Sequence, residues 1–241
     1  MSSTKVRSRI RSFGRIATHM NQEDKTKLDE RLAPFMLSFP EIPSAGDITL
    51  PTQGKVVVEL GIGSGDLLAA RALKEPENNF IGCEVFKNGL KTLVINIEKN
   101  GQKNIQMSDR DGRQLLEALP KKSVDELVIL YPDPWPKKRH NKRRIINAEL
   151  LALADQVLKE DGILFIATDI PDYANWTIHE CYQHGTFFPT AISPAEWSTA
   201  PSWWVSTKYE KKALQAGRKP WYMTFKRHVD KSNTKCQTLP K

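Results

Sequence analysis

The chain has 241 residues, with 36 lysines and arginines against 28 acidic residues, a net charge of +8 and a pI near 9.3. Hydrophobic residues make up 39% of the chain, enough for a sizeable core and too many for a disordered protein. The least polar stretch, 56–65, is about half as long as a membrane-spanning helix and contains Glu59, and the three cysteines are far apart with no histidine at ligand spacing. The sequence therefore predicts a soluble, basic protein of the cytoplasm, without a membrane span, a disulfide framework or a metal site.

The first 22 residues contain no acidic residue and carry five basic residues and four serines. No apolar segment follows them, which excludes a secretory signal, although a mitochondrial transit peptide or a plain solvated tail would have the same composition. The clustered charge favours a flexible arm that neutralises the phosphates of a nucleic acid. We therefore predict an arm at 1–22, one domain at 23–228 and a polar tail at 229–241.

Helical and strand patterns alternate along most of the chain. A helix is expected at 23–33, a proline-rich linker at 34–51, and a buried parallel strand at 55–60, where β-branched residues run together. Further strands are expected at 79–84, 104–107, 124–130, 162–168 and 221–226, and further helices at 66–75, 86–99, 114–119, 144–158 and 173–182. Connections of this length require parallel pairing. The sequence predicts an α/β fold, a Rossmann-like doubly wound sheet that is mostly parallel, with an antiparallel C-terminal strand and helices on both faces.

Three glycines, Gly61, Gly63 and Gly65, stand between the first strand and its helix, where the backbone turns sharply and a ligand can approach closely. Their G-x-G-x-G spacing differs from that of dinucleotide-binding turns, and Glu59 just before them would repel a phosphate. The ammonium and sulfonium of S-adenosylmethionine would tolerate that carboxylate. Glu84, which ends the second strand, is placed to accept hydrogen bonds from ribose hydroxyls. The alternative for both acids is a solvated strand end.

Two aspartates follow the third strand, Asp109 and Asp111, close to where an adenine amino group would lie. One of them is expected to cap the next helix. Spacing alone leaves open which of them faces a ligand.

The segment after the fourth strand combines a stiff loop with a dense run of positive charge. Three prolines fix the backbone around Asp133 and Trp135, which aims Asp133 at the same crevice as the glycine turn. Six of the eight residues at 137–144 are lysine or arginine. Such a run is often just a solvated face. Beside an acidic and aromatic loop, it instead predicts the docking of a polyanionic substrate.

Five segments, in this order, resemble the signature of the tRNA (guanine-N7-)-methyltransferases. They are ELGIGSG at 59–65, IGCE at 81–84, PDPWPKKRHNKRR at 132–144, ATD at 167–169 and TKYE at 207–210. The likeness runs from about residue 9 to residue 225, and the PDPW block with its basic run is its most specific part. The resemblance implies methyl transfer from S-adenosylmethionine to N7 of guanosine 46 in tRNA.

The resemblance also implies residue roles. Cofactor contacts are expected at Glu59, Gly61, Gly63, Gly65, Glu84, Asp133 and an acid after the third strand, for which alignment gives Arg110 or Asp111 and we prefer Asp111. Substrate contacts are expected at Lys137, Asp169, Thr207, Lys208, Tyr209 and Glu210, and RNA contacts at Arg139, His140, Asn141, Lys142, Arg143 and Arg144. The partner is tRNA, and the enzyme is expected as a monomer or a homodimer.

Guanine N7 carries a free lone pair, so no base is needed to remove a proton before methylation. Asp133 is expected to be the catalytic residue, because a fixed carboxylate stabilises the positive charge that develops on the purine. Asp169 would accept hydrogen bonds from the guanine N1 and N2 groups, or would instead cap the next helix. Thr207 and Glu210 would either bind substrate or form an ordinary capping box. Trp135 would stack on the base or the cofactor, or would anchor its own loop.

Three other functions remain to be compared with methyl transfer to N7. A non-catalytic RNA-binding protein on the same fold would have no need of the three acids at 59, 84 and 133. The glycine spacing disfavours an NAD-linked oxidoreductase. A methyltransferase acting on an exocyclic amine is closer, but its Asp/Asn-Pro-Pro-aromatic loop is similar to the PDPW block without matching it.

Overall fold

The structure is a computed structural model, and it describes residues 21–228. The predicted polar tail and all but the last two residues of the predicted basic arm lie outside the described residues. The helices are α1 (Gln22–Leu32), α2 (Asp66–Lys74), α3 (Lys87–Asn100), α4 (Gly112–Ala118), α5 (Ala148–Val157), α6 (Pro171–His184) and α7 (Lys208–Gln215). The strands are β1 (Val56–Leu60), β2 (Asn79–Cys83), β3 (Ile105–Ser108), β4 (Val124–Leu130), β5 (Leu158–Thr168), β6 (Phe187–Pro189) and β7 (Trp221–Arg227). Short 3₁₀ helices are η1 (Ala33–Phe35), η2 (Lys138–Arg143) and η3 (Pro194–Ser198).

The strands form one seven-stranded sheet in the order β3-β2-β1-β4-β5-β7-β6. The first five strands in this order pair in parallel, whereas β7 runs antiparallel to both β5 and β6. The mostly parallel sheet with an antiparallel C-terminal strand confirms the predicted fold class. The carboxyl ends of β1, β2, β3 and β4 meet at one edge of the sheet, where an open α/β fold holds its ligand.

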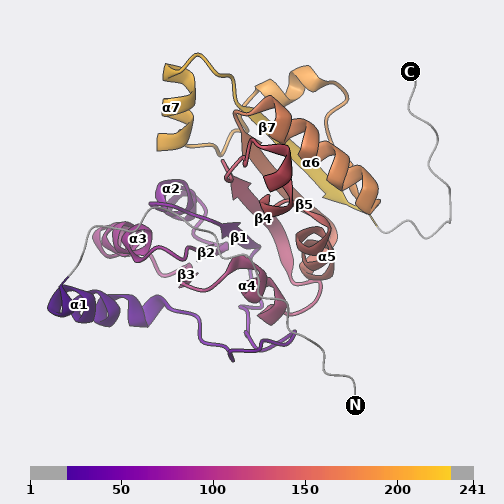
Figure 1. Cartoon of the computed structure of the whole chain (residues 1–241). Helices are drawn as coiled ribbons and strands as arrows, with labels where there is room; N and C mark the ends of the chain where they lie inside the picture. The colour runs from indigo at the N-terminus through magenta and orange to yellow at the C-terminus, as the bar shows by residue number, and fades with distance from the viewer. Residues whose placement is uncertain (1–20, 229–241) are drawn as a thin grey trace.

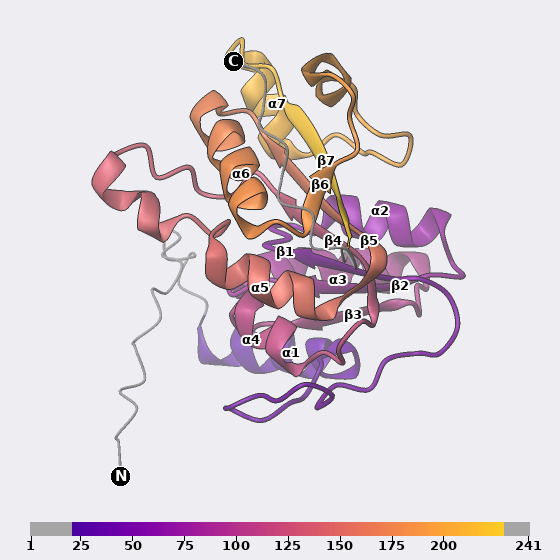
Figure 2. The ribbon, with the colours of Figure 1, turned by 90° about the vertical axis from the view of Figure 1, so that its right-hand side faces the viewer.

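Helices cover both faces of the sheet (Figure 1). One core packs α4, α5 and α6 against strand residues such as Val58 and Ile129, and the other packs α1, α2 and α3 against Val57 and Val128. Neighbouring strand residues contribute to opposite cores because side chains alternate across a strand. The view in Figure 2 shows α5 and α6 side by side on the first of these faces.

The predicted strands and helices are confirmed as far as about residue 130, with boundaries within one or two residues. Beyond that point the predicted helix at 144–158 was wrong at its start, since 138–143 is a separate 3₁₀ turn and α5 begins at Ala148. The side chain of Asn147 caps α5 by accepting a hydrogen bond from the amide of Leu150 at 3.0 Å, which fixes the start of the helix. Within the described residues, no helix has the length and apolar character needed to cross a membrane.

Candidate active site

A cavity of about 330 Å³ opens at the carboxyl edge of the sheet. Its walls come from the glycine turn after β1 (61–65), the end of β2 and the start of α4. The loop after β4, the basic turn that follows it (137–143) and the first turn of α7 complete them. Lining residues that were predicted as site residues are Gly61, Gly63, Glu84, Asp111, Asp133, Lys142, Arg143 and Tyr209, and Trp135 also lines the cavity. The fold thus brings together segments that are up to 149 positions apart, from 60 to 209.

The glycine turn has the left-handed backbone that favours glycine, with φ of 75° at Gly61, 57° at Gly63 and 70° at Gly65. A Cβ at Gly61 would meet open space, so the glycine leaves room at the cavity wall. Gly65 does not line the cavity. A Cβ there would lie 3.0 Å from the side chain of Leu93, so this glycine lets the turn pack on α3.

Gly89 in α3 is a site determinant that the sequence analysis missed. A Cβ at Gly89 would lie 1.9 Å from the carbonyl oxygen of Gly63. We predict that Gly89→Ala pushes the glycine turn into the cavity and weakens binding of S-adenosylhomocysteine at least tenfold, as measured by isothermal titration. A matched control is Gly54→Ala, whose Cβ would lie 2.0 Å from the carbonyl oxygen of Glu77 on the opposite edge of the sheet. This control should lose stability while the folded protein keeps its affinity, and equal loss of affinity in both variants would contradict the assignment.

Glu84 is fixed by the backbone around it. Its carboxylate accepts a hydrogen bond from the amide of Gly63 at 2.9 Å and another from the amide of Phe86 at 3.0 Å. Burial raises the pKa of this carboxyl group, and the two amide donors oppose that shift. The acid thereby ties the glycine turn to the end of β2 and also lines the cavity.

Glu59 lies beside the main cavity rather than in it. Side chains alternate along β1, so Glu59 shares the face of Val57, above α2 and α3. It is 3% exposed and lines a smaller cavity of about 20 Å³, which shares Gly61, Tyr131 and Tyr209 with the larger one. Burial raises the pKa of Glu59 to about 8, and nearby Arg71 opposes the shift while Glu126 adds to it.

The shifted pKa of Glu59 predicts how stability depends on pH. Between about pH 4.5 and 8 the folded state holds a proton on Glu59 that the unfolded state releases, so this residue lowers the free energy of unfolding as the pH rises, by at most about 1.4 kcal/mol per pH unit. Urea titrations of the wild type and Glu59→Gln should therefore show a difference in stability that grows steadily across this range. The lowered pKa values of His140 and His184 act in the opposite direction and cancel in the difference. A difference that does not change with pH would contradict the burial of Glu59.

After β3, the side chains of Asp111 and Arg110 point to different places. Asp111 lines the cavity and is also the cap of α4, accepting from the amide of Arg113 at 2.9 Å. Arg110 turns away and donates to the carbonyl oxygens of Phe39 and Pro40 at 2.9 and 2.6 Å. Asp111 is thus the residue of this segment that reaches the cavity, as we preferred from the alignment, and Arg110 holds the linker instead.

The loop after β4 has a strained backbone. Tyr131 and Trp135 have backbone φ angles of 47° and 40°, which residues other than glycine rarely adopt. Between them Asp133 is exposed and lines the cavity. The hydroxyl of Tyr131 is buried and has no hydrogen-bond partner among the described residues. The rings of Tyr131 and Tyr209 stack at 6.3 Å, which joins this loop to α7 across the cavity.

Trp135 packs on the basic turn that follows it. Its ring meets His140 edge-on at 5.8 Å, and the guanidinium of Arg143 lies 4.8 Å from the ring centre. Both alternatives for this residue are therefore compatible with the structure, since Trp135 anchors its own loop and also lines the cavity.

Arg144, for which an RNA contact was predicted, is turned into the protein instead. Arg144 is 1% exposed, donates to the carbonyl oxygen of Pro134 at 2.9 Å and pairs with Asp172. Its guanidinium also lies near the rings of Tyr173 and Trp176, at 5.3 and 5.1 Å. The residue holds the PDPW block against α6. The sequence of the basic run alone does not show that its last arginine is buried. The neighbouring Lys137, Arg139, Lys142 and Arg143 are exposed.

The predicted substrate residues after β5 and before α7 have local partners. Asp169 pairs with Arg218 at 2.6 Å and does not cap α6, whose cap position is Ile170. Thr207 caps α7 by accepting from the amide of Glu210 at 3.1 Å. Glu210 is 4% exposed, and its carboxylate accepts from the indole of Trp204 at 3.0 Å and from the hydroxyl of Tyr222. Glu210, for which a substrate contact was predicted, is thus buried and anchors α7, while Lys208 and Tyr209 face the cavities.

Comparison with known proteins identifies the family. Residues 53–223, more than half of the chain, match the family model described as "Putative methyltransferase". The chain is 38% identical over 216 residues to the tRNA (guanine-N(7)-)-methyltransferase of Agrobacterium fabrum, covering 88% of this chain and 93% of the relative. It is also 38% identical over 232 residues to that of Roseobacter denitrificans, covering 93% and 99%. The chain belongs to the tRNA (guanine-N7-)-methyltransferase family.

Solved methyltransferases share the fold of this family member at low sequence identity. A 16S rRNA (adenine(1408)-N(1))-methyltransferase from Catenulisporales acidiphilia aligns with a TM-score of 0.54 at 14% identity, covering 90% of this chain and 96% of that one. The 16S rRNA methyltransferase KamB aligns with a TM-score of 0.52 at 13% identity, covering 90% and 98%. The family and the methyltransferase fold predicted from the sequence are both confirmed.

Proposed function

We propose that this chain transfers a methyl group from S-adenosylmethionine to N7 of guanine in tRNA, at guanosine 46 of the variable loop, giving 7-methylguanosine. The observation that carries the proposal is that Glu84, Asp111 and Asp133 line one cavity beside the basic turn at 137–143. A cavity with acids on its walls suits a cationic donor, and exposed lysines and arginines at its rim suit a polyanionic acceptor.

The residues present fit S-adenosylmethionine. The cavity volume of about 330 Å³ is in the range of small-molecule sites. Gly61 leaves the wall open, Glu84 is held rigidly for the ribose hydroxyls, and Asp111 is held for the adenine amino group. Glu59, just before the glycine turn, would bind the ammonium of the methionine part, whose positive charge would favour release of the proton that Glu59 holds in the free protein. The bound donor supplies an electrophilic methyl group on a sulfonium.

The chain's own residues orient the reactants and stabilise charge. Because N7 attacks with its free lone pair, no residue has to remove a proton first. The stiff loop after β4 holds Asp133 at the cavity wall, where its carboxylate stabilises the positive charge that develops on the purine. Proximity and alignment of the attacking nitrogen with the methyl group supply most of the remaining rate.

On the acceptor side, Asp169, Lys137, Thr207, Lys208 and Tyr209 are the proposed substrate contacts. Asp169 would accept hydrogen bonds from the N1 and N2 groups of guanine after its ion pair with Arg218 breaks. Since N7 takes part in tertiary contacts of a folded tRNA, the base has to leave its stack. Trp135 and Tyr209, which both line the cavity, offer ring faces for the extruded guanine.

The basic turn is the proposed docking site for the RNA backbone, with contacts from Arg139, His140, Asn141, Lys142 and Arg143. The arm at 1–22 would add phosphate contacts. We further propose that the domain spans 23–228 and that the enzyme acts in the cytoplasm as a monomer or a homodimer.

Incubation with unmodified tRNA transcript and S-adenosylmethionine labelled in the methyl group tests the proposal. Digestion of the tRNA should release the label as 7-methylguanosine, and a transcript with guanosine 46 replaced by adenosine should take up none. Label in a different nucleoside would refute the base assignment, and no label in any nucleoside would favour the non-catalytic RNA-binding alternative.

A further inference from the structure

A second group of basic residues lies on α7 and the turn that follows it. Lys208, Lys211, Lys212, Arg218 and Lys219 are all exposed. We call them the α7 cluster. The function proposed above uses Lys208 from this group and leaves the other four without a ligand.

The spacing of the α7 cluster is unfavourable unless an anion neutralises it. Lys208 lies three and four positions before Lys211 and Lys212, so the three ammonium groups share one face of the helix and repel one another. Lys211, Lys212 and Lys219 form no ion pair within residues 21–228, whereas Arg218 pairs with Asp169 at 2.6 Å. Glu210, the acid in the middle of this segment, is buried beneath it and turned to Trp204 and Tyr222.

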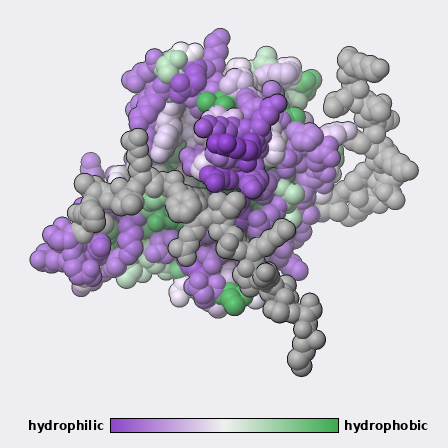
Figure 3. All heavy atoms as spheres, in the orientation of Figure 1, coloured by the Kyte–Doolittle hydropathy of each residue, from purple (hydrophilic) through white to green (hydrophobic). Residues whose placement is uncertain are grey.

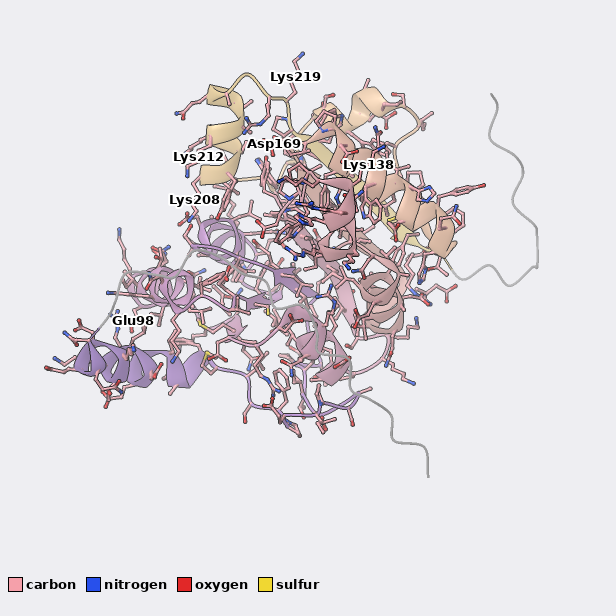
Figure 4. The ribbon with its side chains drawn as sticks, viewed as in Figure 1. Glu98, Lys138, Asp169, Lys208, Lys212 and Lys219 are labelled. Atoms are coloured by element: carbon pink, nitrogen blue, oxygen red, sulfur yellow. The ribbon has the colours of Figure 1, made fainter. Side chains whose placement is uncertain are left out.

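The α7 cluster faces the basic turn across the cavity. Tyr209 from α7 and Lys142 and Arg143 from the basic turn line the same cavity, so both basic segments border its mouth. In Figure 4, Asp169 lies between Lys208 and Lys212 on one side and Lys138 on the other. Figure 3 shows hydrophilic surface over α7 and again over the place where Figure 1 draws the turn at 138–143.

The position of α7 is fixed by its contacts with the rest of the domain. Thr207 caps the helix, Glu210 joins it to Trp204 and Tyr222, and the stacked rings of Tyr131 and Tyr209 join it to the loop after β4. The lysines therefore project from an ordered support, which is what a binding surface needs for low entropic cost.

We propose that the α7 cluster is a second phosphate-binding surface for tRNA, so that the RNA backbone is held on both sides of the cavity mouth and the target guanine enters between them. The inference rests on the proposed function and adds Lys211, Lys212 and Lys219 to it. Lys211, Lys212 and Lys219 are exposed and have no ion pair within residues 21–228, which fits contacts with the phosphates of a nucleic acid backbone, because each such contact releases a counterion.

The test compares two sets of lysine variants of the full chain. Lys211→Ala, Lys212→Ala and Lys219→Ala are combined in one protein, and its binding to tRNA transcript is measured by fluorescence anisotropy at several salt concentrations. We expect at least about tenfold weaker binding near 0.15 M salt, and a slope of log K against log salt that is smaller by about two to three. Affinity for S-adenosylhomocysteine should stay the same.

The matched control is Lys103→Ala with Lys121→Ala. Both lysines are exposed and precede β3 and β4, so they lie at the amino edge of the sheet, opposite the cavity. The control should bind tRNA like the wild type, and replacing the three cluster lysines with arginine should largely preserve binding. A triple alanine variant that matches the control in affinity and salt slope would overturn the proposal. This readout is independent of catalysis, so a wild type that binds tRNA but makes no 7-methylguanosine would refute the proposed reaction and leave the α7 cluster to be judged on binding.

Discussion

Replacing Asp133 with alanine should lower the rate of methyl transfer to tRNA by about 10²- to 10³-fold, the usual effect of removing one group that stabilises developing charge. Asp133 is exposed at the cavity wall, and its position comes from the backbone of a proline-rich loop rather than from burial of its side chain. The substitution should therefore leave the fold and the affinity for tRNA nearly intact. Rates are measured in single turnover with saturating tRNA and labelled S-adenosylmethionine.

A matched control for this variant is Asp161→Asn. Asp161 is exposed, pairs with Lys226 at 3.0 Å and lies near the start of β5, far from the carboxyl edge. Its φ of 62° is a conformation that asparagine also tolerates. The control should retain wild-type rates. An active Asp133→Ala enzyme would remove Asp133 from the mechanism.

Arg144→Ala should destabilise the protein by about 2 to 3 kcal/mol, because it removes a buried side chain and leaves the carbonyl oxygen of Pro134 without its donor, whereas Asp172 is 72% exposed and stays solvated. The guanidinium of Arg144 joins the carbonyl oxygen of Pro134 to Asp172 and packs near the rings of Tyr173 and Trp176. Its loss should also release the PDPW block, so that activity falls even at temperatures where the variant is folded. Urea denaturation and single-turnover rates measure the two effects.

The adjacent Arg143 is the natural comparison. Arg143 is exposed and stacks on Trp135, so Arg143→Ala should change stability by no more than about 1 kcal/mol, within the range for an exposed cation–π contact. It should weaken tRNA binding and reduce the salt dependence, whereas Arg144→Ala should not alter the salt dependence of the folded protein. If the two arginine variants behaved alike in both assays, the separation into an outward and an inward arginine would be wrong.

The sequence predicted the parts of the molecule that depend on local pattern. Runs rich in apolar residues, such as 56–60 and 124–130, indicate their burial by composition alone, and the glycines at 61, 63 and 65 mark a turn that other residues rarely form. The PDPW block was informative because prolines restrict the backbone whatever surrounds them. These features placed Glu84 and Asp133 at one edge of the sheet, as the structure does.

The parts that escaped prediction depend on contacts between distant segments. The segments TKYE at 207–210 and RR at 143–144 give no local sign that Glu210 and Arg144 turn inward, because their partners Tyr222 and Asp172 lie elsewhere in the chain. Glu59 is two residues before the glycine turn, yet the alternation of β1 buries it on the face of α2 and α3. The close approach of Gly89 to the carbonyl oxygen of Gly63, which leaves no room for a Cβ, likewise exists only after α3 packs on the turn.

A crystal structure of the protein with S-adenosylhomocysteine tests the central claim most directly. The ribose hydroxyls should lie within hydrogen-bonding distance of Glu84, the adenine amino group near Asp111, and the sulfur beside the loop that carries Asp133. A ligand bound outside this cavity, or bound with its ribose away from Glu84, would contradict the account.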